Sequence, residues 1–227
     1  MFKSTFDRLV AAFAIVLLSP VLLVIALAVR IDSPGPGLFR QVRIGRNGRR
    51  FRIYKFRTMI DGAHRIAANI SPEGDPRITK VGRVLRGWYL DELPQLFNVL
   101  KGDMSLVGPR PETPEYVSLY TTEERRVLDV RPGLVGPSTL GFMDESERLA
   151  DSLDPGRYYA SVLLHERVRL DLDYLGRRSM RYDVALLIRQ ARAILSHRSR
   201  STSPSDGEPH GIHHVRTRQA GRREGSY

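Results

Sequence analysis

The longest apolar segment of the chain lies close to the N-terminus. Residues 9–29 are 21 consecutive positions without a charged side chain, a length that lets a helix span the hydrocarbon core of a bilayer. Ser19 and Pro20 lie at its centre. Proline removes a helical hydrogen-bond donor, and a neighbouring serine hydroxyl can bind a freed carbonyl. The pattern therefore predicts a helix that bends at Ser19-Pro20.

Three topologies are compatible with this segment. Ala26-Leu27-Ala28 is similar to a signal-peptide cleavage site, but the apolar run is long for a signal peptide and contains a central proline. A plain spanning helix is the stronger alternative. Lys3 and Arg8 precede the run, however, and a dense basic block follows it. Because basic flanks tend to remain in the cytoplasm, this placement favours a re-entrant helix that enters and leaves on one side.

Beyond the turn-rich residues 33–37, two short runs partly alternate apolar with basic residues. They cover residues 38–44 and 51–57, and Asn47-Gly48 lies between them. This arrangement predicts an antiparallel β-hairpin. Its basic face is either a solvated surface or a surface directed at phosphates or lipid headgroups, and the pattern supports both readings equally.

Helical periodicity dominates the remainder of the chain. The expected helices cover residues 77–88, residues 93–100, a long stretch after Asp154-Pro155-Gly156 that continues to Leu175, and residues 181–195. Lys101-Gly102 should end the second of these, because a basic last turn followed by glycine is a common helix terminus. We therefore predict an α+β fold that is mostly helical.

We expect the chain to divide into a membrane helix (residues 1–30), a folded domain (residues 31–196) and a disordered basic tail (residues 197–227). The tail is rich in Ser, Arg and Gly and has few large apolar residues. His210, His213 and His214 in this tail could bind a metal, but histidines in such a segment are a weak indication of a metal site.

Composition and charge narrow the chemistry. The sequence has no cysteine, which excludes disulfides and thiolate metal sites. Its formal net charge is +11, and residues 30–57 hold nine basic residues against the single acid Asp32. Such a block can face nucleic acid, anionic lipid headgroups or a polyphosphate substrate, and basicity alone does not choose among them.

Two adjacent carboxylates, Asp91 and Glu92, lie at the expected start of a helix, shortly before Pro94. Taken alone, Asp91 is best explained as an N-cap, with the proline in the first turn. The functional alternative is an ionised carboxylate that meets a phosphate or a divalent cation, since a carboxylate can attack phosphorus to form an acyl phosphate. Arg86, five residues earlier, could balance the substrate's charge.

A rigid segment follows within twenty residues of Asp91. Pro109 and Pro111 flank Arg110 and restrict the backbone around it. A guanidinium fixed in this way suits phosphate recognition. The alternative is an exposed rigid loop without a binding role.

These features occur together in a recognisable order. Tyr54-Lys55-Phe56-Arg57-Thr58-Met59, the stretch from Leu90 to Pro111 and Val130-Arg131-Pro132-Gly133 follow the broken apolar segment. This arrangement closely resembles the bacterial sugar transferase family of small monotopic phosphoglycosyl transferases, over roughly residues 2–195. The resemblance implies a mostly helical α+β domain on a re-entrant membrane helix, with a β-hairpin and amphipathic helices at the membrane interface.

The resemblance also implies a reaction. Such enzymes move a phosphosugar from a nucleotide diphosphate sugar, usually a UDP-sugar, to polyprenyl phosphate, release UMP and require Mg²⁺. It implies Asp91 as the nucleophile and metal contact and Glu92 as its dyad partner. The other site residues that it implies are Arg86, Arg110, Lys55 and Arg57 near phosphate, Pro109 and Pro111 in the substrate loop, Asp171 near the metal, and Ser19 and Pro20 at the helix break.

The implied setting is the cytoplasmic face of a bacterial inner membrane, at the first membrane step of surface glycan assembly. Expected partners are the UDP-sugar, polyprenyl (undecaprenyl) phosphate and membrane lipids, with self-association possible and no nucleic acid expected. Two other functions fit parts of the sequence: a membrane-bound nucleotide-sugar pyrophosphatase, and a non-enzymatic basic membrane adaptor. Residues 137–145 depart from the Gly-Trp-Ala-Gln-Val-Asn-Gly type run of many relatives, so we expect this segment to influence the choice of sugar.

Overall fold

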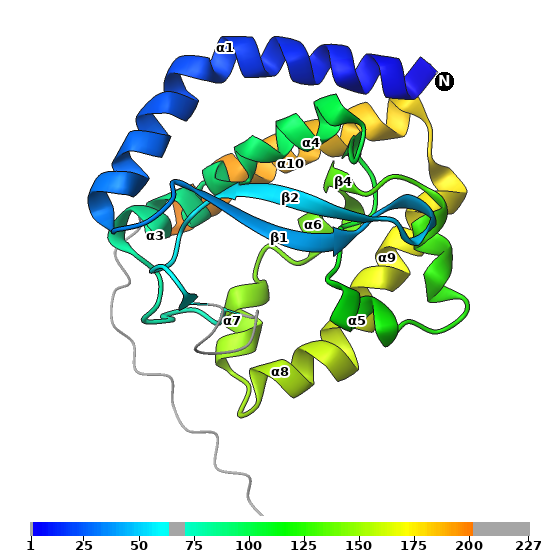
Figure 1. Cartoon of the computed structure of the whole chain (residues 1–227). Helices are drawn as coiled ribbons and strands as arrows, with labels where there is room; N and C mark the ends of the chain where they lie inside the picture. Colours follow the sequence, from blue (N-terminus) through cyan, green and yellow to red (C-terminus); the bar gives the residue numbers. More distant parts are fainter. Residues whose placement is uncertain (1, 64–70, 202–227) are drawn as a thin grey trace, which may run out of the picture.

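A computed structural model describes residues 2–63 and 71–201 of the chain, with side chains up to residue 196 (Figure 1). Within these residues, helices predominate, and the strands form two small two-stranded sheets, as the α+β prediction requires. The three tail histidines and most of the expected basic tail lie outside the described residues.

The N-terminal apolar segment is a single long helix, α1 (Phe2–Asp32), which contains Pro20. Figure 1 shows that α1 bends part of the way along its length. The Ser19 hydroxyl donates a hydrogen bond to the carbonyl of Val16 at 2.8 Å, which is the type of contact expected beside a helical proline. By length and composition α1 could cross a membrane, and only 11% of its most apolar window is buried within the protein.

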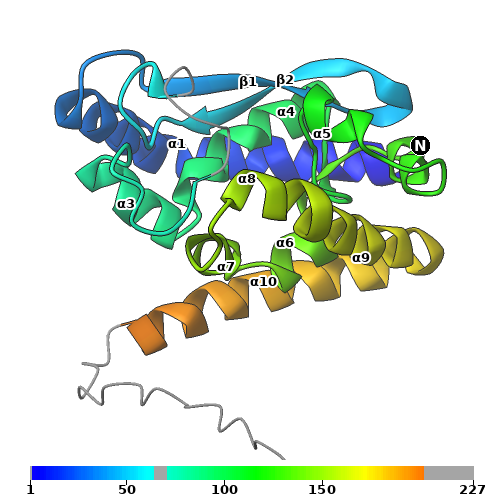
Figure 2. The same cartoon turned by 90° about the horizontal axis from the view of Figure 1, so that it is seen from below.

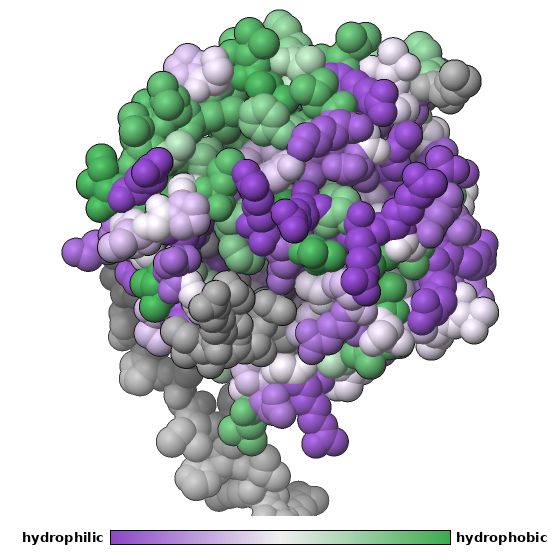
Figure 3. All heavy atoms as spheres, viewed as in Figure 1, coloured by the Kyte–Doolittle hydropathy of each residue, from purple (hydrophilic) through white to green (hydrophobic). Residues whose placement is uncertain are grey.

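One side of α1 nevertheless belongs to the protein core. Ala11 packs in a cluster with Val99 and Met104, while Ile25 and Val29 pack with residues of the hairpin and of α3. The opposite side exposes large apolar side chains, which form a continuous green band in Figure 3. They include Leu9, Phe13, Val16, Leu17, Leu23, Val24 and Leu27.

The predicted hairpin is confirmed. Strand β1 (Leu38–Ile44) pairs antiparallel with β2 (Arg50–Phe56), and a single 3₁₀ turn, η1 (Arg46–Gly48), connects them. Asn47 and Gly48 have positive φ angles of 57° and 74°, which explains why this dipeptide suits the turn.

The segment that carries the two carboxylates begins with α3 (Lys80–Gly87), continues through the 3₁₀ helix η2 (Leu90–Gln95) and ends with α4 (Leu96–Lys101). Gly102, at a φ of 88°, terminates α4 as predicted. The N-cap interpretation of Asp91 is wrong, because Tyr89 occupies the cap position in a left-handed conformation and Asp91 lies in the first turn of η2.

A second sheet was not predicted. Strand β3 (Ser105–Val107) pairs in parallel with β4 (Gly133–Val135). A Cβ atom on Gly133 would collide with the backbone of Gly108, so the close approach of these two segments requires glycine. Each strand has only three residues, too few for a periodic pattern to identify.

The remaining helices surround this framework. They are α5 (Pro114–Ser118), η3 (Glu124–Asp129), α6 (Pro137–Gly141), α7 (Glu145–Ala150), α8 (Pro155–Tyr158), the π-helical segment η4 (Tyr159–Leu163), α9 (Leu164–Arg177) and α10 (Met180–Ser201). The long helix expected up to Leu175 thus consists of three connected segments. Helix α10 continues to Ser201, so the first residues of the expected tail are helical. Figure 2 shows the hairpin along one side of the molecule and α10 along the other.

Candidate active site

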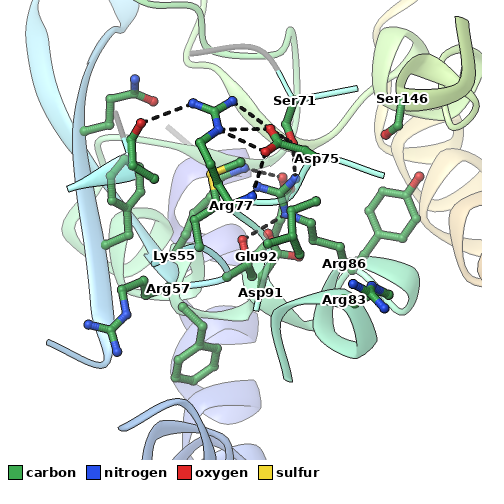
Figure 4. A pocket seen from close by; sticks show the side chains of 18 of the residues that line it. Lys55, Arg57, Ser71, Asp75, Arg77, Arg83, Arg86, Asp91, Glu92 and Ser146 are labelled. Carbon is green, nitrogen blue, oxygen red and sulfur yellow. Dashed lines mark hydrogen bonds and ion pairs between the residues drawn. The ribbon is translucent and has the colours of Figure 1, made fainter. Parts of the chain in front are cut away.

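A large cavity lies between the hairpin, the C-terminal part of α1, α3, η2 and α7. Its volume is about 1450 Å³, which exceeds the range of about 300–1,000 Å³ typical of pockets for a single small ligand. Asp91, Glu92, Lys55, Arg86 and Arg110 all line it. Figure 4 shows Lys55, Asp91, Glu92 and Arg86 gathered in this pocket.

The two neighbouring carboxylates have different surroundings. Lys55 Nζ, on β2, lies 2.6 Å from Glu92 Oε1, and the Arg110 guanidinium lies 3.7 Å from the same oxygen. Asp91 is only 9% exposed and lines the cavity. The cations therefore pair with Glu92 and lie beside Asp91, so that both carboxylates contribute to one charged cluster.

The surroundings move the two pKa values in opposite directions. Burial raises the pKa of Asp91, against the partial opposition of Lys55 and Arg86, and the charge of Glu92 raises it further. Burial also acts to raise the pKa of Glu92, but Lys55 and Arg110 outweigh it and hold that pKa below its ordinary value. Separated pKa values in adjacent carboxylates are typical of a division of roles. Glu92, paired with the cations, is the more acidic carboxylate, and Asp91 is the more basic one.

Arg86 is held in place by two hydroxyl groups. From the last turn of α3, its Nε donates to Thr58 Oγ1 at 2.9 Å and its Nη1 to Ser71 Oγ at 2.7 Å. Ser71 also donates to Asp75, which forms an ion pair with Arg77 at 2.6 Å. This network turns the guanidinium toward the cavity, where the negative charge of Asp91 acts on it.

Sequence reasoning missed Ser71, Asp75 and Arg77. They lie in a segment without regular secondary structure, where no spacing rule places side chains. Thr58 is part of the quoted Tyr54–Met59 motif, but nothing in that motif indicates its contact with Arg86.

The Pro-Arg-Pro segment is fixed by backbone contacts, as its composition predicted. The Pro109 carbonyl accepts a hydrogen bond from Gly133 N at 2.8 Å, and the Pro111 carbonyl accepts one from the Arg43 guanidinium at 3.1 Å. Both prolines are buried, and neither lines the cavity. Their part in the site is to hold Arg110.

Asp171 helps to hold the Pro-Arg-Pro segment and does not line the cavity. Its carboxylate accepts hydrogen bonds from the backbone N–H of Arg110 at 3.0 Å and from the backbone and hydroxyl of Ser138 at 3.2 and 2.8 Å. Burial raises the pKa of Asp171 to about 6, although these hydrogen bonds oppose the shift. The expected metal contact through Asp171 has no support in this geometry, because Oδ2 already accepts hydrogen bonds from Arg110 N and the Ser138 hydroxyl, and Oδ1 accepts one from Ser138 N.

Arg57 is also placed away from the carboxylates. In Figure 4 its guanidinium points away from Asp91. It donates hydrogen bonds to Ser33, Pro34 and Val29 at the C-terminal end of α1. Arg57 lines the cavity, but its guanidinium is engaged by the end of α1, so these contacts give no support to the phosphate-binding role expected for it. Lys55, two residues earlier, lines the cavity and pairs with Glu92.

The cavity offers few protein ligands for a metal, so a metal ion bound there would be held largely by the phosphates of the substrate. Among residues 2–63 and 71–201, no group of three or more metal-binding side chains is assembled. Mg²⁺ is commonly held by one or two carboxylates, waters and substrate phosphates, without a complete protein cage. Asp91 fits such a site as a single carboxylate ligand, whereas Asp171 does not.

The divergent segment forms one wall of the cavity. Met143 and Glu145 line it, together with Ser146, whereas Phe142 is buried between the guanidinium groups of Arg148 and Arg167. Arg167 also pairs with Glu145. Met143 and Glu145 are therefore the residues of the divergent segment that line the cavity, and Ser146 and Glu147 continue the same wall.

Comparison with known proteins gives a consistent picture. The family model described as "Bacterial sugar transferase" matches residues 1–197. The chain is 39% identical over 201 residues to the UDP-glucose:undecaprenyl-phosphate glucose-1-phosphate transferase of Caulobacter vibrioides, covering 86% of this chain and 70% of the relative. It is 42% identical over 164 residues to the UDP-N-acetylgalactosamine-undecaprenyl-phosphate N-acetylgalactosaminephosphotransferase of Aeromonas hydrophila, covering 69% of this chain.

A relative in Escherichia coli K12, a further UDP-glucose:undecaprenyl-phosphate glucose-1-phosphate transferase, is 35% identical over 195 residues and 82% of this chain. The relatives differ in length. The matched region is 38% of the Aeromonas protein and 39% of the Escherichia coli protein.

Proposed function

Because this chain belongs to the bacterial sugar transferase family, we propose that it transfers a phosphosugar from a UDP-sugar to polyprenyl phosphate. The observation that carries this proposal is the buried Asp91 carboxylate, which lines a large cavity together with Lys55, Arg86 and Arg110. The resulting polyprenyl-diphosphate-sugar would begin the assembly of a surface glycan.

In the first step, an Asp91 oxygen attacks the phosphorus that carries the sugar. A bond forms between that oxygen and phosphorus, and the bond from phosphorus to the oxygen of UMP breaks, so that UMP leaves with the electron pair. Lys55, Arg86 and Arg110 offset negative charge on the diphosphate as it reacts. Because the pKa of Asp91 is raised, its carboxylate is more basic than an ordinary aspartate.

In the second step, an oxygen of polyprenyl phosphate attacks the same phosphorus. The bond to Asp91 breaks, the carboxylate is regenerated, and the new diphosphate remains attached to the lipid. Two anionic substrates thus react in turn with one carboxylate and do not have to attack each other directly.

Asp91 is the residue that would hold Mg²⁺, together with oxygens of the substrate. When bound, the ion would supply charge neutralisation at the diphosphate. The cationic side chains already described would position the remaining phosphate oxygens.

The contacts of α1 support a re-entrant topology on the cytoplasmic face of the inner membrane. Near its N-terminus, Lys3 pairs with Asp183 of α10 at 2.6 Å, and Asp7 accepts a hydrogen bond from Ser105 of β3 at 2.6 Å. Near its C-terminus, Asp32 accepts a hydrogen bond from Val81 N at 3.0 Å. Both ends therefore contact the same domain, whereas a spanning helix would place one end about 30 Å away, across the hydrocarbon core.

Release of UMP tests the proposal against its alternatives. The purified protein, Mg²⁺ and a panel that includes UDP-glucose and UDP-N-acetylgalactosamine are assayed with and without undecaprenyl phosphate. Sustained release that requires the lipid, with formation of the lipid diphosphate sugar, is the expected result. Sustained release without the lipid would identify a pyrophosphatase, and no release from any donor would favour the membrane adaptor.

A further inference from the structure

Arg57 connects the hairpin to the end of the membrane helix. Its Nη2 donates to the Ser33 carbonyl at 2.6 Å, the Ser33 hydroxyl at 2.9 Å and the Val29 carbonyl at 3.3 Å, while Nη1 donates to the Pro34 carbonyl at 2.8 Å. The residue is 5% exposed. The last carbonyls of a helix lack intrahelical partners and favour a nearby cation. Arg57 supplies both the hydrogen bonds and the charge.

The surrounding backbone accommodates this side chain closely. Gly35 has a φ of 115°, and a Cβ atom there would collide with the Arg57 guanidinium. The turn after α1 therefore folds around Arg57. A shorter or non-planar side chain at this position could not reach the same set of acceptors.

The residues beside Arg57 contact the catalytic cluster. Lys55 pairs with Glu92, and Thr58 accepts a hydrogen bond from Arg86. Between them, Phe56 is buried against Ile25 and Val29 of α1 and Leu85 of α3. In residues 55–58, the two outer residues thus contact the groups around Asp91, and the two inner residues contact the C-terminal half of α1 and the turn that follows it.

The contacts on the catalytic side do not depend on Arg57. Lys55 lies opposite Phe39 in the β1–β2 ladder, and the Thr58 carbonyl accepts a hydrogen bond from Thr79 N at 3.0 Å. Loss of the Arg57 contacts would leave the end of α1 held only by the Asp32 hydrogen bond and the packing of Ile25 and Val29, so its position would be less strictly fixed while Lys55 and Thr58 remain in place.

We propose that Arg57 is a positioning residue that fixes the end of the membrane helix relative to Asp91 and thereby aligns the lipid-borne acceptor phosphate. This inference rests on the proposed transferase function. The nucleotide sugar reaches the cavity from water, and α1 contributes only Ala26 and Arg30 to the lining, so the reaction of the donor with Asp91 depends little on how strictly the end of α1 is fixed. The acceptor phosphate is attached to a chain held in the same bilayer as α1, so its approach to Asp91 depends on the position of α1 directly.

The test separates the two half-reactions in Arg57→Lys, which keeps the charge but lacks the planar fork of donors. The single-turnover burst of UMP without acceptor should stay within about threefold of the wild type. The KM for undecaprenyl phosphate in phosphatidylglycerol–phosphatidylethanolamine vesicles should rise about tenfold or more, because small misalignments cost large factors in rate. With a water-soluble short-chain prenyl phosphate, the variant and wild type should differ by no more than about threefold, since that acceptor does not depend on α1 for its approach.

Ser33→Ala provides a milder form of the same change, since it removes one acceptor and introduces no strain, and it should show the same pattern with a smaller increase. Arg52→Lys, at an exposed position on β2, is the matched control and should behave as the wild type. Equal losses with both acceptors, loss of the UMP burst, or normal bilayer turnover in both Arg57→Lys and Ser33→Ala would overturn the inference. A wild-type protein that releases no UMP would instead contradict the proposed function.

Discussion

Lys55 Nζ lies 2.6 Å from Glu92 Oε1, so the lysine neutralises the carboxylate adjacent to the proposed nucleophile and not the nucleophile itself. Glu92 stays charged because of this pair, and its charge in turn helps to raise the pKa of Asp91. Several measurable properties of the enzyme depend on this relationship.

Replacing the nucleophile should abolish turnover. Asp91→Asn preserves size but removes the attacking oxygen anion, so kcat should fall by several orders of magnitude while the fold is retained. Steady-state UMP release and circular dichroism measure the two effects, and mass spectrometry of the wild type with donor alone should detect a phosphosugar adduct on Asp91. Asp173→Asn, at an exposed position on α9, is the control. Near-normal turnover of a folded Asp91→Asn protein would refute the assignment.

The raised pKa of Asp91 predicts the acid side of the pH profile. Protonation removes the nucleophile, so kcat/KM should decline as the pH falls through the pKa of Asp91, and the midpoint should lie above the value of about 3.9 for an unperturbed aspartate. A pH series of initial rates with saturating Mg²⁺ measures it. If the acid limb of the profile has its midpoint at or below the ordinary pKa of an aspartate, burial does not set the pKa of Asp91 during catalysis.

Removing the lysine should leave a buried charge without its main partner. In Lys55→Met, Glu92 loses its closest cation and keeps the longer ion pair with Arg110, and we expect both a lower melting temperature and a loss of about 10²-fold or more in kcat. Thermal unfolding and UMP release measure the two quantities. Lys55→Arg should recover part of the activity because it restores a cation at the same place. Equal activity of the Met and Arg variants would mean that the charge is not needed.

The cavity wall formed by residues 143–146 should influence which UDP-sugar the enzyme prefers. Exchange of residues 143–146 for those of a relative should change the ranking of UDP-sugars, while the requirement for polyprenyl phosphate stays the same. Competition assays with mixed donors report the ranking directly. Ser138→Ala tests the buried side of the region: it should reduce activity through the Asp171–Arg110 support without changing donor preference. An active, folded exchange variant with unchanged preference would exclude this wall from sugar selection.

Topology can be tested by cysteine labelling because the native chain has no cysteine. Ser4→Cys should be shielded from an impermeant reagent in intact cells, since Lys3 and Asp7 contact the catalytic domain. Changing Ser19 and Pro20 to Ala and Leu should favour a straight spanning helix and make the cysteine at position 4 accessible to the reagent. Labelling in the otherwise native protein would rule out the re-entrant arrangement.

The sequence predicted those features that follow from local rules. Asn47-Gly48 identified the hairpin turn and Gly102 the end of α4, because each position requires a positive φ. The same rules failed at Asp91, where the left-handed Tyr89 took the cap position, and at β3 and β4, where the pairing depends on contacts distant in sequence.

The residue types in the sequence indicated which chemistry the site could perform, but not which side chains would contact one another. Lys55 and Arg57 lie two residues apart in one basic motif, yet only Lys55 contacts Glu92. Alternation along a strand would place both side chains on the same face, but β2 ends at Phe56, and the position of α1 next to Arg57 depends on tertiary packing. Asp171 similarly supports Arg110 from a helix sixty-one residues away, a relationship that spacing does not reveal.

The packing of α1 also affects how the protein can be handled. Removing a membrane anchor is a common way to obtain a soluble fragment, but here the inner side of the anchor completes two hydrophobic clusters through Ala11, Ile25 and Val29. Truncation before residue 33 would expose Val99, Phe56 and Leu85 to water and remove the hydrogen-bond acceptors that α1 offers to Arg57. A truncated protein without the helix should therefore aggregate, and purification of an active enzyme should require detergent or lipid nanodiscs that retain it.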